Sequence, residues 1–568
     1  MASELTRSAL IALFTLGCGS EPLARYPVSG PMLKDPDLRP VNFPCRPDKG
    51  NPNRTVCRPR EYRSSLWWDG ADQSLFRPMS HFFAVQPGGE AANVNSLDEL
   101  PDSSWFTNRI GSRPFPPSEL ARGYCAQTPA LPVDLPDGSW VIDRGKGDGA
   151  TPGFRIDVKG VGKFSLKSDD FFSPEKASAA EAIVSRLYYA AGYSVPCYFV
   201  VYFRPSLLKL TPGLTYRTNI GRVSPFDAAA LDRLLARLPR RGELVRMGVS
   251  VWLPGRTLGP FTYQGTRDDD PRDVVPHEDR RDLRAMRLLA SWVNHFDSRE
   301  ENSMETWVTR ADDEDASPGF VQRWLLDFGD CLGSQWTIDE FARRLGHSFY
   351  FDPGYILADW FTFGLIERPW DRAYSLDYMF PYFRSDNFVP ERWKTGYPNP
   401  AFARMTEVDA AWMARIIARF TPEHLQAAIA AGKFSGQSHA DLLFSILLER
   451  RRRILKRYLE RVSPIGALEV RGNELCGIDF ARSSGVFEAP RFRYAASLFY
   501  PAPARALAAR ASADGRVCVS LPESPTQADE TGYFALRMTN GQARGELRAF
   551  LYKLDDGYRL AGIERPEP

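Results

Sequence analysis

The chain of 568 residues is too long for one hydrophobic core, and we therefore expect two to four domains. Its composition, with 43% hydrophobic and 25% charged residues, is that of an ordinary globular protein. A formal net charge of +2 gives no argument for binding to nucleic acid or to an anionic membrane surface, so no nucleic-acid partner is expected.

The first residues contain a short apolar run, Ala9–Gly17, which follows Arg7 and ends at Cys18. This pattern resembles a bacterial lipoprotein signal, in which the cysteine is lipidated and becomes the first residue of the mature protein. The resemblance implies a signal peptide at residues 1–18 and export to the cell envelope. A lipid at Cys18 would then anchor the protein in the outer membrane or at the cell surface. The alternative interpretation is an N-terminal helix that is buried or frayed.

The other cysteines show no spacing that is typical of a zinc site, so zinc is not expected. They are Cys45, Cys57, Cys125, Cys197, Cys331, Cys476 and Cys518. Cys45 and Cys57 flank a loop rich in Pro and Gly and can close it by a disulfide, and Cys476 and Cys518 can do the same in the last part of the chain. Export permits both pairs, but the spacing leaves the connectivity open.

Residues 19–135 form an N-terminal extension with many Pro, Gly and Arg residues. Two aromatic clusters, Leu66–Trp68 and Ser103–Phe106, are expected to pack against the lobe that follows, because exposed pairs of Trp side chains are uncommon. The alternative is a surface for a partner.

From residue 136 to residue 255 short strands dominate, and we expect a β-rich lobe. The strands Trp140–Ile142 and Gly153–Val158 flank a turn that contains Gly145, Gly147 and Gly149. Glycines let the backbone approach an anion closely and direct its N–H groups at phosphate oxygens. The turn is therefore a candidate phosphate-binding loop, although glycine-rich hairpins without a ligand are common.

The next strand, residues 163–167, alternates so that Phe164 and Leu166 point away from Lys167. Lys167 is thus placed to reach phosphates under the glycine-rich turn, with Lys163 as the competing candidate. A helix is predicted over residues 174–191, and its Glu181 can pair with Lys167 or lie in solvent. Strands at 197–203 and 244–253 and a hinge at residues 254–255 complete this lobe.

The stretch that carries the chemistry begins after a predicted helix over residues 278–293. Asp297 has Asn302 five residues further on, and a second apolar run ends in Asp327-Phe328-Gly329. Each piece alone is a weak signal, but the two together, in this order, are the layout of a phosphoryl-transfer site. His295 is interpreted as a brace for the loop backbone rather than as a proton acceptor.

These motifs resemble the protein-kinase-like superfamily. The resemblance implies that Asp297 is the catalytic base and that Asn302 and Asp327 bind the metal. It also implies that Lys167 holds the phosphates of ATP and that Glu181 positions this lysine. The implied cofactors are ATP and Mg²⁺ (or Mn²⁺).

The implied fold is α+β and bilobal, with a β-rich small lobe and a helical large lobe. A closer likeness, carried by residues 149–154, 166–167 and 191–193 and by the two motifs, is to exported bacterial lipoproteins that are kinase-like. It covers about residues 90 to 460 and implies no substrate. Among the divergent members of the superfamily, the likeness is to the HipA-type, CotH-type and secretory-pathway kinases.

The expected large lobe, residues 256–462, has no Ala-Pro-Glu segment after Asp330, so it lacks the part with which ordinary protein kinases hold a peptide. Helices are predicted over 406–420, 421–431 and 439–461, the first with a capping box of Thr406 and Asp409. We expect Asp268–Asp270 to be solvated surface and Arg450–Arg453 to be a solvated basic face.

Residues 463–568 alternate between apolar and polar side chains, with turns at Asn540-Gly541 and Asp556-Gly557, which predicts a small β-sandwich-like domain. The leading interpretation of the whole chain is an exported kinase-like phosphotransferase that uses Mg-ATP on an unknown protein or small-molecule substrate. One alternative is an inactive pseudokinase or binding scaffold of the cell envelope, where ATP is scarce. The other is transfer of AMP on the same fold.

Overall fold

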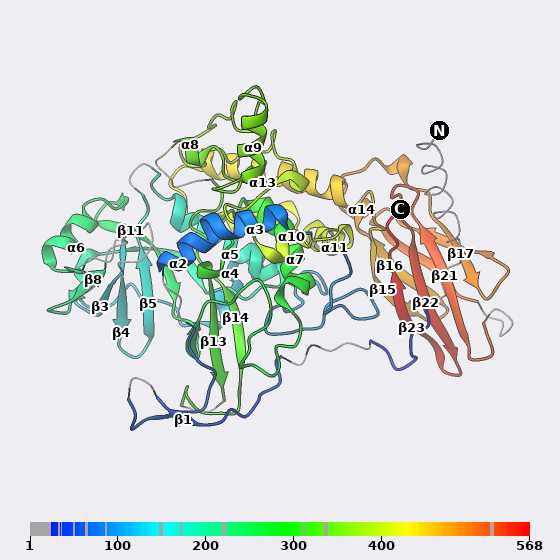
Figure 1. The fold of residues 1–568 in the computed structure, drawn as a ribbon, viewed down its shortest axis with the longest axis horizontal. Helices are drawn as coiled ribbons and strands as arrows, with labels where there is room; N and C mark the ends of the chain where they lie inside the picture. Colours follow the sequence, from blue (N-terminus) through cyan, green and yellow to red (C-terminus); the bar gives the residue numbers. More distant parts are fainter. Residues whose placement is uncertain are drawn as a thin grey trace, which may run out of the picture.

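The computed structural model describes residues 24–568 except for 32–34, 36, 49–50, 63–65, 86–87, 147–151, 171–172, 218–222, 311–312, 334–338 and 523–527. Cys18, Gly147 and Gly149 lie outside the described residues. The described part is a mixed structure of α-helices and several β-sheets, in agreement with the predicted α+β class (Figure 1). None of its helices is both long and apolar enough to cross a membrane.

The first large sheet has seven strands, in the order β10-β11-β5-β4-β3-β7 with β6 paired to β11. All neighbours are antiparallel except β3 and β7. The strands are β3 (Trp140–Lys146), β4 (Gly153–Val158), β5 (Gly162–Lys167), β6 (Tyr198–Phe203), β7 (Leu208–Leu210), β10 (Arg240–Arg241) and β11 (Leu244–Val251). The strands predicted over residues 140–142, 153–158, 163–167, 197–203 and 244–253 are therefore confirmed, the last of them ending at Val251. Phe164 and Leu166 are buried in the core of the sheet, as their alternation indicated.

A helix, α5 (Lys176–Ala191), packs on β6 and β11 of this sheet. At the outer end of the sheet lie β8 (Thr215–Arg217), β9 (Val223–Pro225) and α6 (Ala228–Leu235), on the left of Figure 1. Asp227 caps α6 by accepting a hydrogen bond from the backbone of Ala230, 2.9 Å away.

The middle of the molecule is helical (Figure 1). Its helices are α4 (Pro117–Arg122), α7 (Arg281–Val293), α8 (Asp339–Ala342), α9 (Pro353–Phe361), α10 (Pro400–Ala403), α11 (Glu407–Ala418), α12 (Pro422–Ala430) and α13 (Gln437–Tyr458). Helix α7 packs against α11 and α13, and one apolar cluster joins these helices to α5. The capping box of Thr406 and Asp409 is present at the start of α11, as predicted. A three-stranded sheet of β12 (Arg256–Gly259), β13 (Ser303–Thr309) and β14 (Gly319–Leu325) lies beside them.

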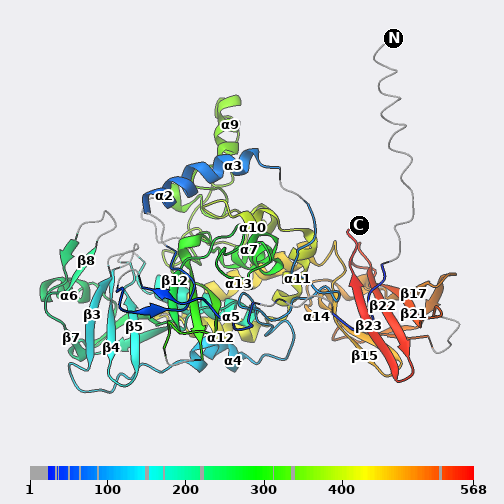
Figure 2. The same ribbon diagram turned by 60° about the horizontal axis from the view of Figure 1, so that its bottom comes forward.

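The N-terminal extension wraps around the molecule rather than forming a core of its own (Figures 1 and 2). Tyr26 packs on Phe550 of the last sheet, and the β1 (Arg46–Pro47) and β2 (Thr55–Val56) ribbon comes next. Helices α2 (Leu66–Ala71) and α3 (Arg77–Phe83), joined by a π-helical turn, then cross above α7 and α10 in Figure 2. Trp105 and Phe106 are both buried: Phe106 packs on Tyr193 as predicted, whereas Trp105 packs on Phe261 and His277, beyond the lobe that directly follows the extension.

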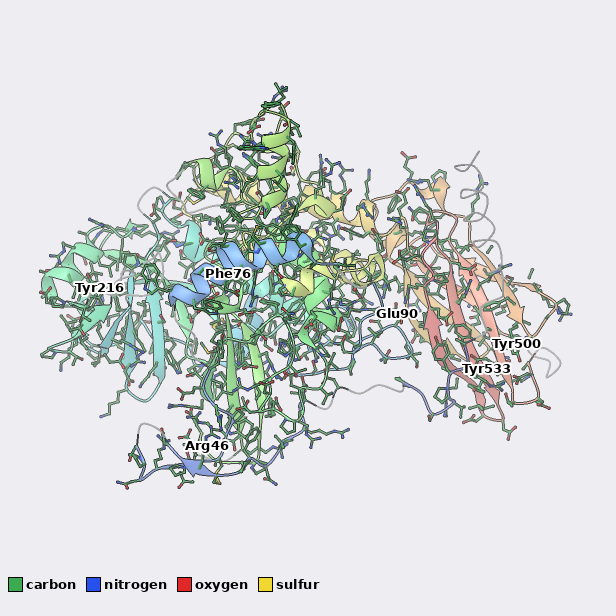
Figure 3. All side chains as sticks on the ribbon, in the orientation of Figure 1. Arg46, Phe76, Glu90, Tyr216, Tyr500 and Tyr533 are labelled. Carbon is green, nitrogen blue, oxygen red and sulfur yellow. A yellow bond between two sulfur atoms is a disulfide. The ribbon has the colours of Figure 1, made fainter. Side chains whose placement is uncertain are left out.

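The packing predicted for the other aromatic cluster is wrong, because the side chains of Trp67 and Trp68 are 87% and 59% exposed. The π-helical turn and α3, which follow α2, meet the rest of the chain through Gln73 and Pro78, which are buried. Phe76, in the turn between α2 and α3, is also exposed and is labelled on the outer face of the molecule in Figure 3.

Two charged stretches that we expected to be solvated are partly buried. Asp270 is 5% exposed and lies 3.3 Å from a guanidinium nitrogen of Arg323. Arg450 and Arg451 are 4% and 7% exposed. Arg450 donates hydrogen bonds to the last-turn carbonyls of α7, and Arg451 donates to those of α11. The ends of helices leave carbonyl groups without partners and favour a positive charge, which explains why these arginines are drawn inside.

Residues 465–564 contain two further sheets (right of Figure 1; Tyr500 and Tyr533 in Figure 3). The first consists of β15 (Ile465–Arg471), β16 (Glu474–Asp479), β20 (Arg516–Ser520) and β19 (Ala509–Ala511). The second consists of β18 (Arg505–Leu507), β17 (Ala495–Tyr500), β21 (Tyr533–Thr539), β22 (Leu547–Leu554) and β23 (Gly557–Glu564). A short helix, α14 (Phe480–Ser483), follows β16. Apolar side chains of both sheets form one core.

Three disulfides connect parts of the described chain. Cys45–Cys57 closes the β1–β2 ribbon, and Cys476–Cys518 joins directly opposed residues of β16 and β20. These are the two pairs that the sequence suggested. The third, Cys125–Cys197, was not predicted, and it ties the extension to the start of β6 across 72 residues. Cys331 is buried as a free thiol.

Candidate active site

The loop between α7 and β13 carries Asp297 and Asn302. Helix α7 ends at Asn294, whose backbone is left-handed with φ of 55°, so the chain turns sharply into the loop. The Asn294 carboxamide oxygen accepts a hydrogen bond from the indole nitrogen of Trp393 at 2.8 Å. The main-chain oxygen of Phe296 accepts another from the backbone of Gly396 at 2.8 Å. The segment around residues 393–396 therefore holds this loop in place.

Asp297 has a partner at each carboxylate oxygen. The side-chain nitrogen of Asn302 donates to Oδ2 of Asp297 at 2.7 Å and to its main-chain oxygen at 2.9 Å. Nε of Arg299 lies 3.1 Å from Oδ1. The five-residue spacing in the sequence thus brings Asp297 and Asn302 into direct contact.

Burial raises the pKa of Asp297 to about 7, and the carboxylates of Asp330 and Asp327 add to this effect. The charge of Arg299 and the hydrogen bond from Asn302 oppose it. A carboxyl group whose pKa lies near neutrality can accept a proton and release it again at that pH, which is what a general base requires.

Asp327 lies beside this loop at the end of β14. The backbone N–H of Leu326 donates to the main-chain oxygen of Asn302 at 2.9 Å, which joins the two segments. Asp327 has a left-handed backbone with φ of 56°, and its side chain is 49% exposed. Its backbone N–H donates to the hydroxyl of Tyr198 at 3.2 Å. The carboxylate is therefore presented at the surface of the site by a rigid turn.

His295 lies beneath the site and supports it. Its Nδ1 is 2.9 Å from the hydroxyl of Tyr188, and its ring packs against Phe328 with centroids 5.1 Å apart. Burial lowers the pKa of His295 to about 3, so the ring is neutral at physiological pH. This geometry supports the interpretation of His295 as a brace.

Lys167 joins the first sheet to the Asp327 turn. Its Nζ lies 2.5 Å from Oε1 of Glu181 on α5 and 3.1 Å from Oδ1 of Asp327. Burial opposes the lysine charge, but Asp327 and Glu181 together raise the pKa of Lys167 well above its ordinary value. Of the two readings of Glu181, the ion pair is therefore the one observed.

Helix α5 can approach the sheet closely because Gly248 of β11 has no side chain. A Cβ at Gly248 would lie 2.9 Å from Cβ of Ser178 on α5. The competing lysine, Lys163, is exposed, and none of its contacts with described residues reaches this site.

The glycine-rich turn is described only in part. In the strand register Lys146 pairs with Gly153 and Gly153 pairs with Lys167, so the turn begins next to the strands that carry the lysine. A Cβ at Gly153 would lie 2.1 Å from the main-chain oxygen of Leu166. At Gly145 it would lie 3.0 Å from Cβ of Tyr216. Both glycines permit close packing, and the positions of Gly147 and Gly149 fall outside the described residues.

Several residues near Asp297 were not identified from the sequence. The guanidinium of Arg299 lies over the ring of Tyr397, which packs in turn against Tyr350 with centroids 4.8 Å apart. Lys176 donates to the main-chain oxygen of Gly329 at 2.9 Å, and burial lowers the pKa of this lysine to about 8. An Arg two residues after a predicted catalytic Asp was a usable signal. The two tyrosines gave none, because they are 53 and 100 residues away in the chain.

The extension also touches the loop. The side-chain nitrogen of Gln73 lies 2.7 and 2.8 Å from the two carboxylate oxygens of Glu301. Arg77 makes an ion pair of 2.8 Å with Glu300. These contacts hold the residues that directly precede Asn302.

The oxygen donors of Asn302 and Asp327 fit Mg²⁺, which prefers one or two protein oxygens together with phosphate and water. The amide nitrogen of Asn302 is occupied by Asp297, which leaves its oxygen as the donor atom. Among the described His, Cys, Asp and Glu residues, one compact group of three donors occurs, Glu474 with Cys476 and Cys518. Both of its sulfurs are in a disulfide, so this group does not fit a metal.

Comparisons of this chain with known protein families, with curated proteins and with solved structures found no match.

Proposed function

We propose that the chain is a kinase-like phosphotransferase that uses ATP and Mg²⁺, with the seven-stranded sheet and α5 as the small lobe and the helical part as the large lobe. One observation carries the proposal. Lys167 contacts both Glu181 and Asp327, so a strand, a helix and a distant turn converge on one ammonium group. The Asp297–Asn302 contact on the adjoining loop supports it.

In this proposal Lys167 binds the phosphates of ATP, and Glu181 holds the lysine in position. The hydroxyl oxygen of the substrate attacks the γ-phosphorus, its proton passes to Asp297, and ADP leaves. Asn302 and Asp327 would hold Mg²⁺, which would neutralise charge on the phosphates. Arg299, which forms an ion pair with Asp297, adds a second positive charge beside the reacting group. Catalysis of this kind consists mostly of positioning and electrostatic stabilisation.

We also propose that the protein is exported and anchored to the membrane by a lipid at Cys18. The three disulfides support this location, because disulfides persist in oxidising compartments. A Cys18→Ser variant should move from the membrane fraction to the soluble fraction when cells are fractionated. An unchanged membrane share contradicts the anchor.

Calorimetric titration with ATP and Mg²⁺ or Mn²⁺ tests the nucleotide site. Asp327→Asn should abolish binding of Mg-ATP, whereas Asp297→Asn should retain binding and lose about 10²–10⁴-fold in turnover. Asp268→Asn, an exposed carboxylate of the large lobe, is the matched control and should change neither quantity.

The alternatives give different outcomes in the same experiments. A wild-type protein that binds no nucleotide with either metal is a scaffold, and the catalytic assignment is then wrong. Transfer of label from [α-³²P]ATP rather than [γ-³²P]ATP to the acceptor identifies AMP transfer. If the Asp327→Asn variant binds Mg-ATP as tightly as the wild type does, Asp327 is not a metal ligand.

A further inference from the structure

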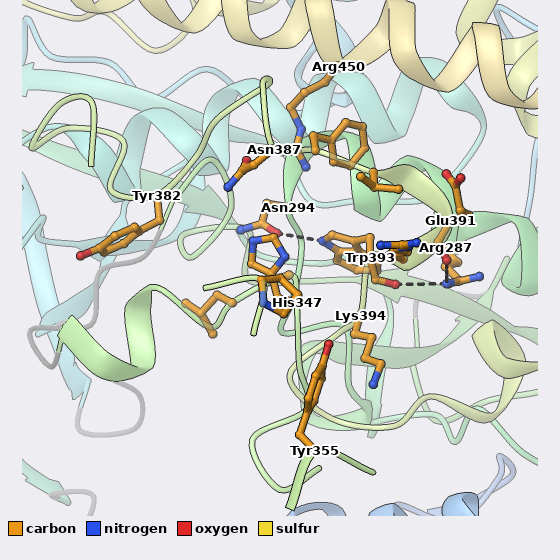
Figure 4. A pocket seen from close by; sticks show the side chains of 16 residues that line it. Arg287, Asn294, His347, Tyr355, Tyr382, Asn387, Glu391, Trp393, Lys394 and Arg450 are labelled. Carbon is orange, nitrogen blue, oxygen red and sulfur yellow. Dashed lines mark hydrogen bonds between the residues drawn. The ribbon is translucent and has the colours of Figure 1, made fainter. Parts of the chain in front are cut away.

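A cavity lies behind the loop that carries Asp297, and the proposed function does not use it. It has a volume of about 440 Å³ and is enclosed by the end of α7, residues 345–347, residues 387–394 and α13 (Figure 4). Of the residues in the Asn294–Asn302 loop, Asn294 is the one that lines this cavity. The cavity is therefore separate from the contacts of Asp297, Asn302 and Asp327.

Positive charge dominates the wall of this cavity. Arg287, Arg392, Lys394 and Arg450 line it, and Glu391 is the one acidic residue among its lining side chains. Lys394 is neutralised by Asp352 at 2.7 Å, and Glu391 lies 3.5 Å from Arg457 outside the wall. The charge of Glu391 also acts on Arg287, so the three arginines share this one acidic side chain.

None of these three arginines makes an ion pair with a residue that the structure describes. Arg450 donates its hydrogen bonds to main-chain oxygens of Ser291, Trp292 and Arg384. Arg287 donates to the main-chain oxygens of Glu391 and Trp393, at 3.0 and 3.1 Å (Figure 4). The carbonyl dipoles at the end of α7 offset part of the charge of Arg450 and do not act on the other two arginines in this way.

The titration of the neighbouring groups reflects this excess of positive charge. Burial lowers the pKa of Arg287, and burial together with Arg453 lowers the pKa of Arg450 well below its ordinary value. Burial and the charge of Arg450 lower the pKa of His347 to about 4. A charge that is buried without a counter-ion is unfavourable, so an anion in the cavity would stabilise the charged forms of Arg287 and Arg450.

Aromatic side chains form part of the remaining wall. Trp393 lines the cavity and donates its indole N–H to Asn294 at 2.8 Å, and Tyr355 and Tyr382 are also among the lining residues (Figure 4). Guanidinium groups bind planar oxyanions by paired hydrogen bonds, and aromatic walls bind apolar groups.

We propose that this cavity is a binding site for a small organic oxyanion. The arginines hold its phosphate, sulfate or carboxylate group, and the aromatic wall contacts its apolar portion. The site does not depend on the proposed phosphotransferase activity.

Calorimetric titration of the full chain, without a divalent metal, tests this site with phenyl phosphate, benzoate and phenol as probes. At least one of the two anions should bind, and phenol should bind at least about tenfold more weakly, because it lacks the charged group. The tighter of the two anions distinguishes a phosphate from a carboxylate ligand. If phenol binds as tightly as both anions, the proposal is wrong. It is also wrong if neither anion binds at millimolar concentration.

A variant and a spectroscopic measurement locate the bound anion. Arg392 is exposed and makes no side-chain hydrogen bond or ion pair with the described residues, so Arg392→Gln should fold normally and weaken anion binding about tenfold or more. Arg505→Gln, in the last β region, is the matched control and should bind as the wild type does. Equal affinity of both variants contradicts the site.

The NMR titration of His347, assigned with the His347→Gln variant, reports on the same cavity. A bound anion offsets the charge of Arg450, so the pKa of His347 should rise from about 4 when the protein is saturated with the probe. If the anion binds but the pKa of His347 does not change, the anion binds elsewhere on the molecule and the assignment to this cavity is wrong.

Discussion

The side-chain nitrogen of Asn302 lies 2.7 Å from Oδ2 of Asp297. The same nitrogen also contacts the main-chain oxygen of Asp297 at 2.9 Å, so the carboxamide cannot rotate without losing two hydrogen bonds. Asn302 therefore fixes the direction of the Asp297 carboxylate and, at the same time, the direction of its own oxygen. One amide thus orients both a candidate base and a candidate metal ligand.

Replacement of Lys167 by Met should lower the affinity for ATP by about 10- to 100-fold, because a charge-assisted contact to phosphate is lost. It should also destabilise the fold, since Glu181 is 4% exposed at its side chain and would lose its ion pair with Lys167. Calorimetric titration and thermal unfolding measure the two effects. Lys163→Met, on the same strand, is the matched control and should alter neither. If both variants bind ATP with equal affinity, Lys167 does not bind the phosphates.

Replacement of Asp297 by Asn should stabilise the metal-free protein above pH 7. Burial raises the pKa of Asp297 to about 7, so between pH 4 and pH 7 the folded chain binds more protons here than the unfolded chain. The stability that this proton provides is present at low pH and is lost as the pH rises through 7. Urea unfolding at pH 5 and pH 8 should show a gain of at least about 1 kcal/mol for Asp297→Asn at the higher pH. A variant that is less stable than the wild type at pH 8 contradicts the raised pKa.

Removal of the contacts between the extension and the catalytic loop should loosen that loop. In a Gln73→Ala/Arg77→Ala double variant, Glu300 and Glu301 lose the partners that the structure gives them from α3 and the turn before it. Amide hydrogen exchange at residues 298–303 should become faster, and turnover should fall while the protein remains folded. The control is Arg39→Ala, at an exposed position of the extension. Unchanged exchange in the double variant shows that these contacts do not hold the loop.

Replacement of Asp98 by Asn should destabilise the protein by about 3–5 kcal/mol, because three buried guanidinium groups lose their shared anion. Asp98 contacts Arg281, Arg415 and Arg565, which belong to α7, α11 and the last residues of the chain. Urea unfolding at pH 7 measures the loss, and Asp555→Asn, at an exposed turn, is the control. A loss no larger than that of the control contradicts the role of this cluster.

The wild-type protein should also lose the contribution of Asp98 in acid. Burial opposes the charge of Asp98, but the three arginines lower its pKa to about 2. Between pH 4 and pH 2 the unfolded chain therefore binds more protons at this residue than the folded chain, and the free energy of unfolding falls as the pH falls. The difference in stability between the wild type and Asp98→Asn should shrink over this interval.

The local pattern of the sequence predicted the elements that carry the candidate site. Alternation in β5 placed Lys167 opposite Phe164 and Leu166, and the helical period of α5 placed Glu181 beside the sheet. The left-handed backbone at Asp327 and the contact of Leu326 with Asn302 could not be predicted, because they depend on how two distant segments meet.

The predictions that were wrong concern charged and aromatic side chains. A run of arginines on a helix resembles a solvated face, yet Arg450 and Arg451 bind carbonyl groups at the ends of two other helices. Trp67 and Trp68 are apolar, yet they are exposed, and the turn and helix that follow them contact the molecule through Gln73 and Pro78. Composition alone does not distinguish these cases, because the partner groups come from far away in the chain.

Cys331 follows the Asp-Phe-Gly-Asp turn directly, and it is completely buried. Among the described cysteines it is the one outside a disulfide, and burial raises the pKa of its thiol well above the ordinary value. A thiol in this state reacts with an alkylating reagent only while the surrounding structure is open. Its rate of labelling therefore measures, without any engineered probe, how often the segment behind Asp327 opens and whether a nucleotide slows that opening.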